Sequence, residues 1–174
     1  ITQSGVDGFI SEGWLGHAYS LSWITEQQWL NSVNMAVWVQ NNLLAVRSHG
    51  IFLPITTCAS TNPDSGLGNL NGVPANQYTT YVFASMLLAA KYSGNYLNFG
   101  TTDTYSQNLF KINVGTPVGD YYLVSGTHVY ARDYSNVKVL VNPTGSSYTV
   151  SLSSSYRTQD GALAGSSITV AAHS

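Results

Sequence analysis

The sequence predicts an α/β fold followed by an all-β fold within one chain of 174 residues. Up to about residue 112, short apolar runs alternate with segments of helical periodicity, which is the pattern of βα units. After residue 112, closely spaced strand signals are separated by turns. The length suits one domain, or one compact domain with a small appendage, and it is sufficient to bury a core.

The first strand and the first helix are predicted near the start of the chain. Val6–Ser11 is a short strand candidate, and Thr25 with Gln28 has the pattern of a capping box. An amphipathic helix is therefore predicted from Glu26 to about Leu44, with Glu26 in the first turn, where a carboxylate interacts favourably with the helix N-terminus. The apolar residues with helical spacing are Trp29, Leu30, Val33, Val37 and Leu44.

Two more strands and one more helix are predicted before residue 112. Ile51–Ile55 is a buried strand candidate, although Pro54 lacks a backbone donor and places the end of this strand at an edge or a bulge. Residues 60–76 form a long loop rich in Asn, Gly, Pro and Ser. A largely buried helix is predicted from Asn76 to Tyr92, followed by a third strand at Tyr96–Phe99. The predicted order is β, α, β, α, β.

The remainder of the chain predicts an antiparallel β-sandwich or half-barrel of about five or six strands. Its strands alternate apolar and polar residues and carry no cluster of carboxylates, so we expect it to be structural and to pack against the helices. The strand candidates are His128–Arg132, Val137–Val141, Tyr148–Leu152 and Ile168–Ala171.

The composition is poor in charge and weighs against several classes of function. Charged residues make up 8% of the chain and the net charge is -2, so there is no basic stripe for nucleic acid. The longest apolar stretch, Phe83–Ala90, is too short to cross a bilayer. Four isolated His residues, one Cys and no phosphate-binding loop predict neither a metal nor a cofactor. Abundant hydroxyl, amide and Tyr side chains favour a secreted protein that meets carbohydrate.

Two motifs resemble a known family. The segment Tyr130–Thr144 (YARDYSNVKVLVNPT), with Tyr148–Leu152, Asp160-Gly161 and Ile168–Val170 after it, resembles the C-terminal β-domain that follows a catalytic (β/α)8 barrel in many glycoside hydrolases. Asp7–Gly13 (DGFISEG) is similar to a strand of the glycosyl hydrolase family of extracellular barrel proteins. In the first motif Val137 stands where those domains usually have Gly.

The resemblance implies partial (β/α)-barrel units over residues 1–112 and a C-terminal β-sandwich domain over residues 113–174. It implies the C-terminal portion of a secreted glycoside hydrolase acting on a polysaccharide or oligosaccharide. A complete barrel needs roughly 200 to 250 residues, so we expect a partner, either the missing N-terminal part of the barrel or another copy of the chain. The alternative is a non-catalytic extracellular protein that binds carbohydrate or has a structural role.

Candidate site residues follow from where barrel enzymes place their chemistry. Glycosidic bond cleavage usually needs two carboxylates, and barrel enzymes carry them at the carboxyl ends of strands. This criterion selects Glu12 and Asp103 as catalytic candidates, although each is also consistent with an ordinary loop carboxylate. Trp14, His17 and Tyr19 follow Glu12 and are candidate substrate contacts. The alternative for the aromatic residues is that they cover the core.

Overall fold

The computed structural model describes residues 8–16, 22–44, 51–56, 73–91 and 108–174. The described part has mixed helices and strands, as the sequence predicts. Its elements are β1 (Gly8–Glu12), α1 (Glu26–Val39), a π-helical turn η1 (Gln40–Leu44), β2 (Ile51–Ile55), α2 (Ala75–Ala89), β3 (Tyr122–Leu123), β4 (Tyr130–Asp133), β5 (Lys138–Val141), β6 (Tyr148–Ser151) and β7 (Ser167–Val170).

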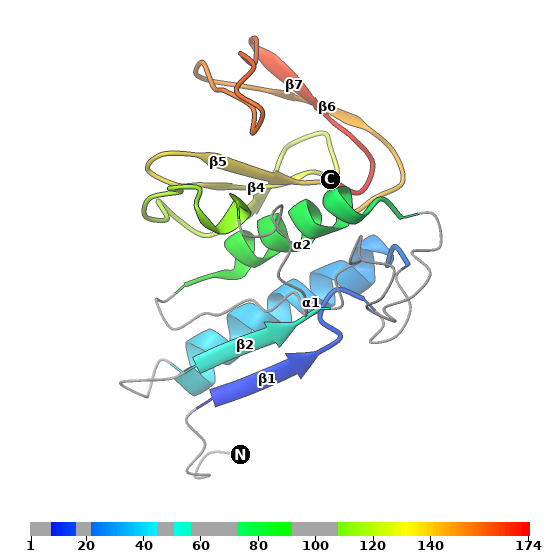
Figure 1. The fold of residues 1–174 in the computed structure, drawn as a ribbon, viewed down its shortest axis with the longest axis vertical. Helices are drawn as coiled ribbons and strands as arrows, with labels where there is room; N and C mark the ends of the chain where they lie inside the picture. The colour runs from blue at the N-terminus through cyan, green and yellow to red at the C-terminus, as the bar shows by residue number, and fades with distance from the viewer. Residues whose placement is uncertain (1–7, 17–21, 45–50, 57–72, 92–107) are drawn as a thin grey trace.

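The elements are stacked in layers. Figure 1 shows the pair β1–β2 at one end of the molecule, then α1, then α2, then β4–β5, with β6–β7 at the other end. β1 and β2 are parallel, with Gly8 opposite Ile51 and Glu12 opposite Ile55, and α1 lies between them in the sequence. This is one βαβ unit, as predicted. The third predicted strand, residues 96–99, lies outside the described residues.

The described strands form no barrel. β1 and β2 make a two-stranded sheet, which is far too narrow to close on itself. The C-terminal strands make two small antiparallel sheets, one of β3, β4 and β5 and one of β6 and β7. Four of these strands lie within two residues of their predicted bounds, whereas β3 was not predicted because two exposed residues show too little alternation.

The predicted long first helix changes its geometry near the end. The capping box is present, since the Thr25 side chain accepts from the Gln28 backbone and the Gln28 side chain accepts from the Thr25 backbone. The α-helix ends at Val39 and continues as a π-helical turn. There the buried Gln40 side chain donates to the Ala36 and Ala89 carbonyls, both at 2.9 Å, and accepts from the Lys91 backbone at 2.8 Å. The π-turn thus ties the end of α1 to the end of α2.

The main core lies where α1, α2 and the β3–β5 sheet meet. Trp29 of α1 is fully buried, and its indole nitrogen donates to Ser85 Oγ of α2 at 2.9 Å. Tyr130 of β4 lies 4.7 Å from the Trp29 ring, measured between ring centroids. The core therefore crosses the predicted boundary near residue 112, and the predicted packing of the β-region on a helix is confirmed. Other buried members of this core include Val33, Ala36, Val39, Phe52, Tyr81, Val82, Leu88, Val139 and Val141.

Glu26 links the start of α1 to β4. Its carboxylate accepts a hydrogen bond from the Tyr130 hydroxyl at 2.7 Å, and its other oxygen lies 2.8 Å from His128 Nδ1. Burial, and then the Glu26 carboxylate, raise the pKa of Tyr130, so the hydroxyl keeps its proton and donates. The position of Glu26 in the first turn of α1 explains only part of its role. Its carboxylate also connects α1 to β4, which lies more than 100 residues later in the sequence.

Arg132 of β4 is a buried cation at the carboxyl end of α2. Its guanidinium donates to the carbonyls of Leu87 at 2.9 Å and Leu88 at 3.0 Å, to that of Ala90, and to that of Gly119 at 2.8 Å. The last carbonyls of a helix lack partners within the helix and carry partial negative charge. A guanidinium with several donors in one plane satisfies them and joins the sheet to the helix.

We predict that Arg132→Lys lowers the free energy of unfolding by about 2 to 4 kcal/mol, since an ammonium group cannot reach all of these carbonyls. Urea unfolding followed by circular dichroism measures the change. The matched control is Arg157→Lys, whose side chain is exposed and should change stability by less than about 0.5 kcal/mol. Equal stability of the two variants would contradict the capping role.

Candidate functional site

The candidate site lies at the carboxyl ends of β1 and β2. Glu12 is the last residue of β1, as predicted, and its register partner Ile55 is the last residue of β2. The backbone pairing extends one step further, because the Trp14 amide donates to the Ile55 carbonyl at 3.0 Å. In sheets of parallel strands, ligands bind outside this edge. The segment directly after Glu12 therefore forms the rim of the candidate site.

A tight turn follows Glu12. Gly13 has a φ of 69° and Leu15 a φ of 61°, and the Gly16 amide donates to the Gly13 carbonyl at 3.1 Å. Glycine adopts a positive φ without steric cost, whereas a positive φ at a leucine costs roughly 1 to 2 kcal/mol of conformational free energy. Leu15 is 2% exposed, so burial of its side chain offsets this cost. The conformation of the turn is therefore stabilised both by glycine at Gly13 and by burial of the Leu15 side chain.

Tyr78 of α2 holds this turn in place. Its buried hydroxyl donates to the Leu15 carbonyl at 3.2 Å and lies 3.2 Å from the hydroxyl of Thr56, the residue after β2. A Cβ atom on Gly16 would lie 2.4 Å from the Tyr78 hydroxyl, so only glycine allows this close approach. One side chain from α2 thus links the segments that follow both parallel strands.

Trp14 was predicted as a substrate contact, and the structure places it in the core. Its side chain is 2% exposed, and its indole nitrogen donates to the Ser32 carbonyl of α1 at 3.3 Å. A ring buried in this way has no free face for a sugar, so the alternative of a core-covering residue describes Trp14 better. The physical reason is that Trp14 lies in the turn that begins at Gly13, where its ring packs against α1 and donates to the Ser32 carbonyl.

Of the other predicted site residues, the structure describes only the backbone of Glu12. The backbone of Glu12 is described as the end of β1, and its side chain is outside the description. Asp103, His17 and Tyr19 lie outside the described residues. The structure thus confirms the strand-end position of Glu12, and the pairing of Glu12 with Asp103 stays a prediction. Within the described part of the chain, no group of three His, Cys, Asp or Glu residues is arranged to hold a metal.

Sequence reasoning missed the aromatic cluster behind the rim. The Trp23 ring lies 5.8 Å from that of Tyr78 and 5.4 Å from that of Tyr81, and it stacks on His173 with ring centroids 4.5 Å apart. Gln77 of α2 donates to the carbonyl of His173 at 3.0 Å. No local pattern in the sequence indicates this contact, because His173 is 150 residues from Trp23 in a turn after β7.

Two polar groups in this cluster, the Tyr81 hydroxyl and His173 Nδ1, are buried and have no hydrogen-bond partner among the residues that the structure describes. Burial, and then the neighbouring Tyr78, raise the pKa of Tyr81. Burial also lowers the pKa of His173, because a charged imidazolium is less well solvated there than in water. Both groups are therefore neutral. The cluster packs beneath the rim as an uncharged aromatic layer.

Comparisons with known proteins return no match: no protein-family model, no curated protein and no solved structure is similar to the chain.

We predict opposite effects for two neighbouring tyrosines of α2. Tyr78→Phe should lower the free energy of unfolding by about 1 to 2 kcal/mol, since it removes the bond to the Leu15 carbonyl. Tyr81→Phe should raise the free energy of unfolding by up to about 1 kcal/mol, because it removes a buried hydroxyl that has no partner within the described part of the chain. Chemical denaturation of both variants tests this, and a loss of stability in Tyr81→Phe as large as that in Tyr78→Phe would contradict it.

We also predict a pH effect at His173. Its pKa is lower in the folded state than the unperturbed value of about 6.5, so the unfolded chain binds the proton more tightly. The free energy of unfolding should therefore decrease as pH falls below about 6.5. His173→Phe keeps an aromatic ring on Trp23 and should show a smaller decrease in urea melts between pH 7.5 and pH 5.

The matched control for this variant is His128→Phe, which replaces a more exposed imidazole on the protein surface. The His128→Phe variant should still show the decrease in the free energy of unfolding that His173 causes as pH falls. If the pH dependence of His173→Phe equals that of the wild type, the titrating group is elsewhere.

Proposed function

We propose that this chain is the C-terminal portion of a secreted glycoside hydrolase that acts on a polysaccharide or an oligosaccharide. The observation that carries the proposal is the β1–α1–β2 unit, whose first strand ends in a carboxylate residue, Glu12, at the carboxyl edge of parallel strands. This is where barrel enzymes place catalytic groups. The two C-terminal antiparallel sheets, of which the β3–β5 sheet packs on α2, support the same proposal, since they agree with the resemblance of Tyr130–Thr144 to a C-terminal β-domain.

The exposure of the β1–β2 sheet supports a partial barrel. Phe52, on one face, is fully buried in the core, whereas Ile10 and Ile51 on the other face are 63% and 44% exposed. Parallel sheets are normally covered on both faces. Further parallel strands that pair with this sheet and close it into a barrel would enclose Ile10 and Ile51 in the barrel interior. In this proposal those strands come from the missing N-terminal part of the barrel or from another copy of the chain.

The packing of the C-terminal sheets supports a small β-sandwich. Val129, Val150 and Val170 form a second buried cluster, with Leu140 and Ile168 packed against it. These residues come from both antiparallel sheets or their immediate flanks, so the two sheets share apolar contacts. We therefore propose a sandwich over residues 113–174 whose role is structural.

The proposed chemistry uses two carboxylates on opposite sides of the glycosidic bond. Glu12 serves as the acid or base that titrates during the reaction, and Asp103 is the candidate partner within this chain. The locked turn after Glu12 provides a fixed rim, because Tyr78 and Trp14 anchor it to α2 and α1. In this arrangement His17 and Tyr19 contact the sugar, while Trp14 supports the rim from below.

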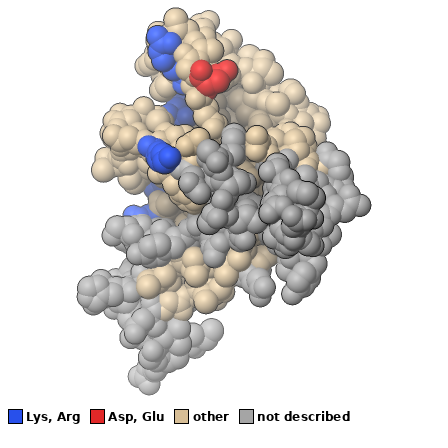
Figure 2. Space-filling view, viewed as in Figure 1, with Lys and Arg blue, Asp and Glu red and all other residues tan. Residues whose placement is uncertain are grey.

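A non-catalytic carbohydrate-binding or structural protein is the second candidate. The observation that favours it is the neutral surface: Figure 2 shows isolated charged side chains surrounded by uncharged surface over the described part of one face. Neutral hydrogen-bonding groups suit carbohydrate whether or not it is cleaved. Release of reducing ends from an oligosaccharide mixture separates the two candidates, because a binding protein retains the sugars intact.

We predict that Glu12→Gln in the complete enzyme lowers turnover by a hundredfold or more and leaves the thermal unfolding midpoint almost unchanged. The amide keeps the shape of the side chain and removes its titrating proton. The control is Asp160→Asn, a fully exposed carboxylate between β6 and β7 that should keep full activity. A Glu12→Gln enzyme with more than about a tenth of wild-type activity would remove Glu12 from the catalytic role.

A further inference from the structure

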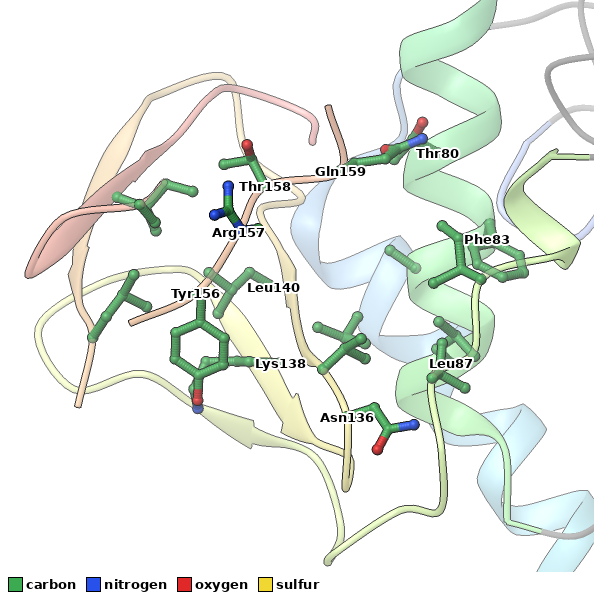
Figure 3. A pocket seen from close by; sticks show the side chains of 18 of the residues that line it. Thr80, Phe83, Leu87, Asn136, Lys138, Leu140, Tyr156, Arg157, Thr158 and Gln159 are labelled. Atoms are coloured by element: carbon green, nitrogen blue, oxygen red, sulfur yellow. The ribbon is translucent and has the colours of Figure 1, made fainter. Parts of the chain in front are cut away.

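A cavity of about 680 Å³ lies between α2, β5 and the segment that connects β6 to β7. Figure 3 shows Phe83 and Leu87 on the α2 side of this cavity and Tyr156, Arg157 and Thr158 on the opposite side. It is built from different residues than the strand-end site. Its volume falls within the range of about 300 to 1,000 Å³ that is usual for small-molecule sites.

The walls of the cavity are mainly aliphatic. Leu87 of α2, Val139 and Leu140 of β5, and Ile168 of β7 all line it. Sugars usually bind on flat aromatic faces beside many polar groups, whereas branched aliphatic side chains from several elements suit a hydrocarbon. Each methylene group that moves from water into such an environment contributes about 0.8 kcal/mol. The ligand body that fits these walls is therefore an alkyl chain or a compact hydrocarbon.

The charge of the lining is one-sided. Among the described residues that line the cavity, Lys138 and Arg157 are the cations and there is no Asp or Glu. Lys138 is already paired, because its ammonium lies 2.6 Å from the Asp133 carboxylate and donates to the Tyr122 hydroxyl at 2.7 Å. Arg157 donates to the Gly161 carbonyl at 2.8 Å and has no ion pair within the described part of the chain. A guanidinium with unused donors favours a carboxylate, which it can bind through two hydrogen bonds.

We propose that this cavity binds an amphipathic carboxylate, with the hydrocarbon body against the α2 and β5 walls and the carboxylate on Arg157. The inference does not depend on the proposed hydrolase activity, because it uses neither Glu12 nor the parallel strands. Charge complementarity at Arg157 distinguishes this ligand from a neutral hydrocarbon, and the aliphatic walls distinguish it from a saccharide.

The test is isothermal titration calorimetry of the whole chain with decanoate, 1-decanol and maltotriose. Decanoate should bind more tightly than 1-decanol, and maltotriose should not bind. Arg157→Gln should weaken decanoate about tenfold and change 1-decanol less than twofold. The matched control is Lys111→Gln, which removes an exposed cation outside the lining and should change neither ligand.

Filling the cavity tests its location. Ala84→Phe adds a ring from the α2 wall and Ala164→Phe adds one from the opposite wall, so each folded variant should lose decanoate binding. Thermal melts identify which of the two is folded. The proposal is overturned if the wild type does not bind decanoate, if Arg157→Gln weakens both alkyl ligands equally, if a folded filling variant binds normally, or if maltotriose competes with decanoate.

Discussion

The burial of the Arg132 guanidinium against the carboxyl end of α2 is the constraint on which the arrangement of the described elements depends. A buried cation without partners costs many kcal/mol, and the last carbonyls of a helix are costly when they are buried without donors. The guanidinium gains acceptors and the helix carbonyls gain donors, so these bonds favour the observed position of β4 on α2. Tyr134, the residue after β4, adds a second bond to this helix end, since its hydroxyl donates to the Leu87 carbonyl at 2.6 Å.

The orientation of α2 in turn determines the rim of the candidate site. With its carboxyl end held by Arg132, the amino-terminal half of α2 brings Tyr78 to the segments after β1 and β2. Trp23 and His173 pack behind Tyr78, and Gln77 holds the last turn of the chain. The C-terminal region and the strand-end turn are therefore mechanically connected through one helix. The position of the turn after β1 therefore depends on contacts that α2 also makes with the C-terminal region.

The two open features of the molecule, the exposed face of β1–β2 and the cavity beside β5, have different physical characters. The sheet face exposes the apolar side chains of Ile10 and Ile51, whereas parallel sheets are normally covered on both faces. The cavity is concave and combines aliphatic walls with Arg157, which has no ion pair among the described residues, as expected for a site that binds a small ligand. Figure 1 shows β1–β2 and β5 in different layers of the molecule, with α1 and α2 between them.

The sequence by itself determined the types of the elements and most of their bounds. The capping box at Thr25 and the periodicity after Glu26 locate the start of α1, and the apolar run Ile51–Ile55 is the strand β2, because these signals depend on residues that are neighbours along the chain. The strand-end position of Glu12 also follows from local pattern. The predicted pairing with Asp103 and the contacts of His17 and Tyr19 concern residues outside the described part.

Only the tertiary structure decided which side chains meet across long separations. The burial of Trp14, the use of the Tyr78 hydroxyl to hold the turn after Glu12, and the placement of Arg132 on α2 have no signature in the sequence. An aromatic residue has the same local pattern whether it faces the core or a ligand, and a strand arginine has the same pattern whether it faces water or a helix end. Packing of distant elements resolves these alternatives, because the free energy of burying a polar group depends on the partner that it finds there.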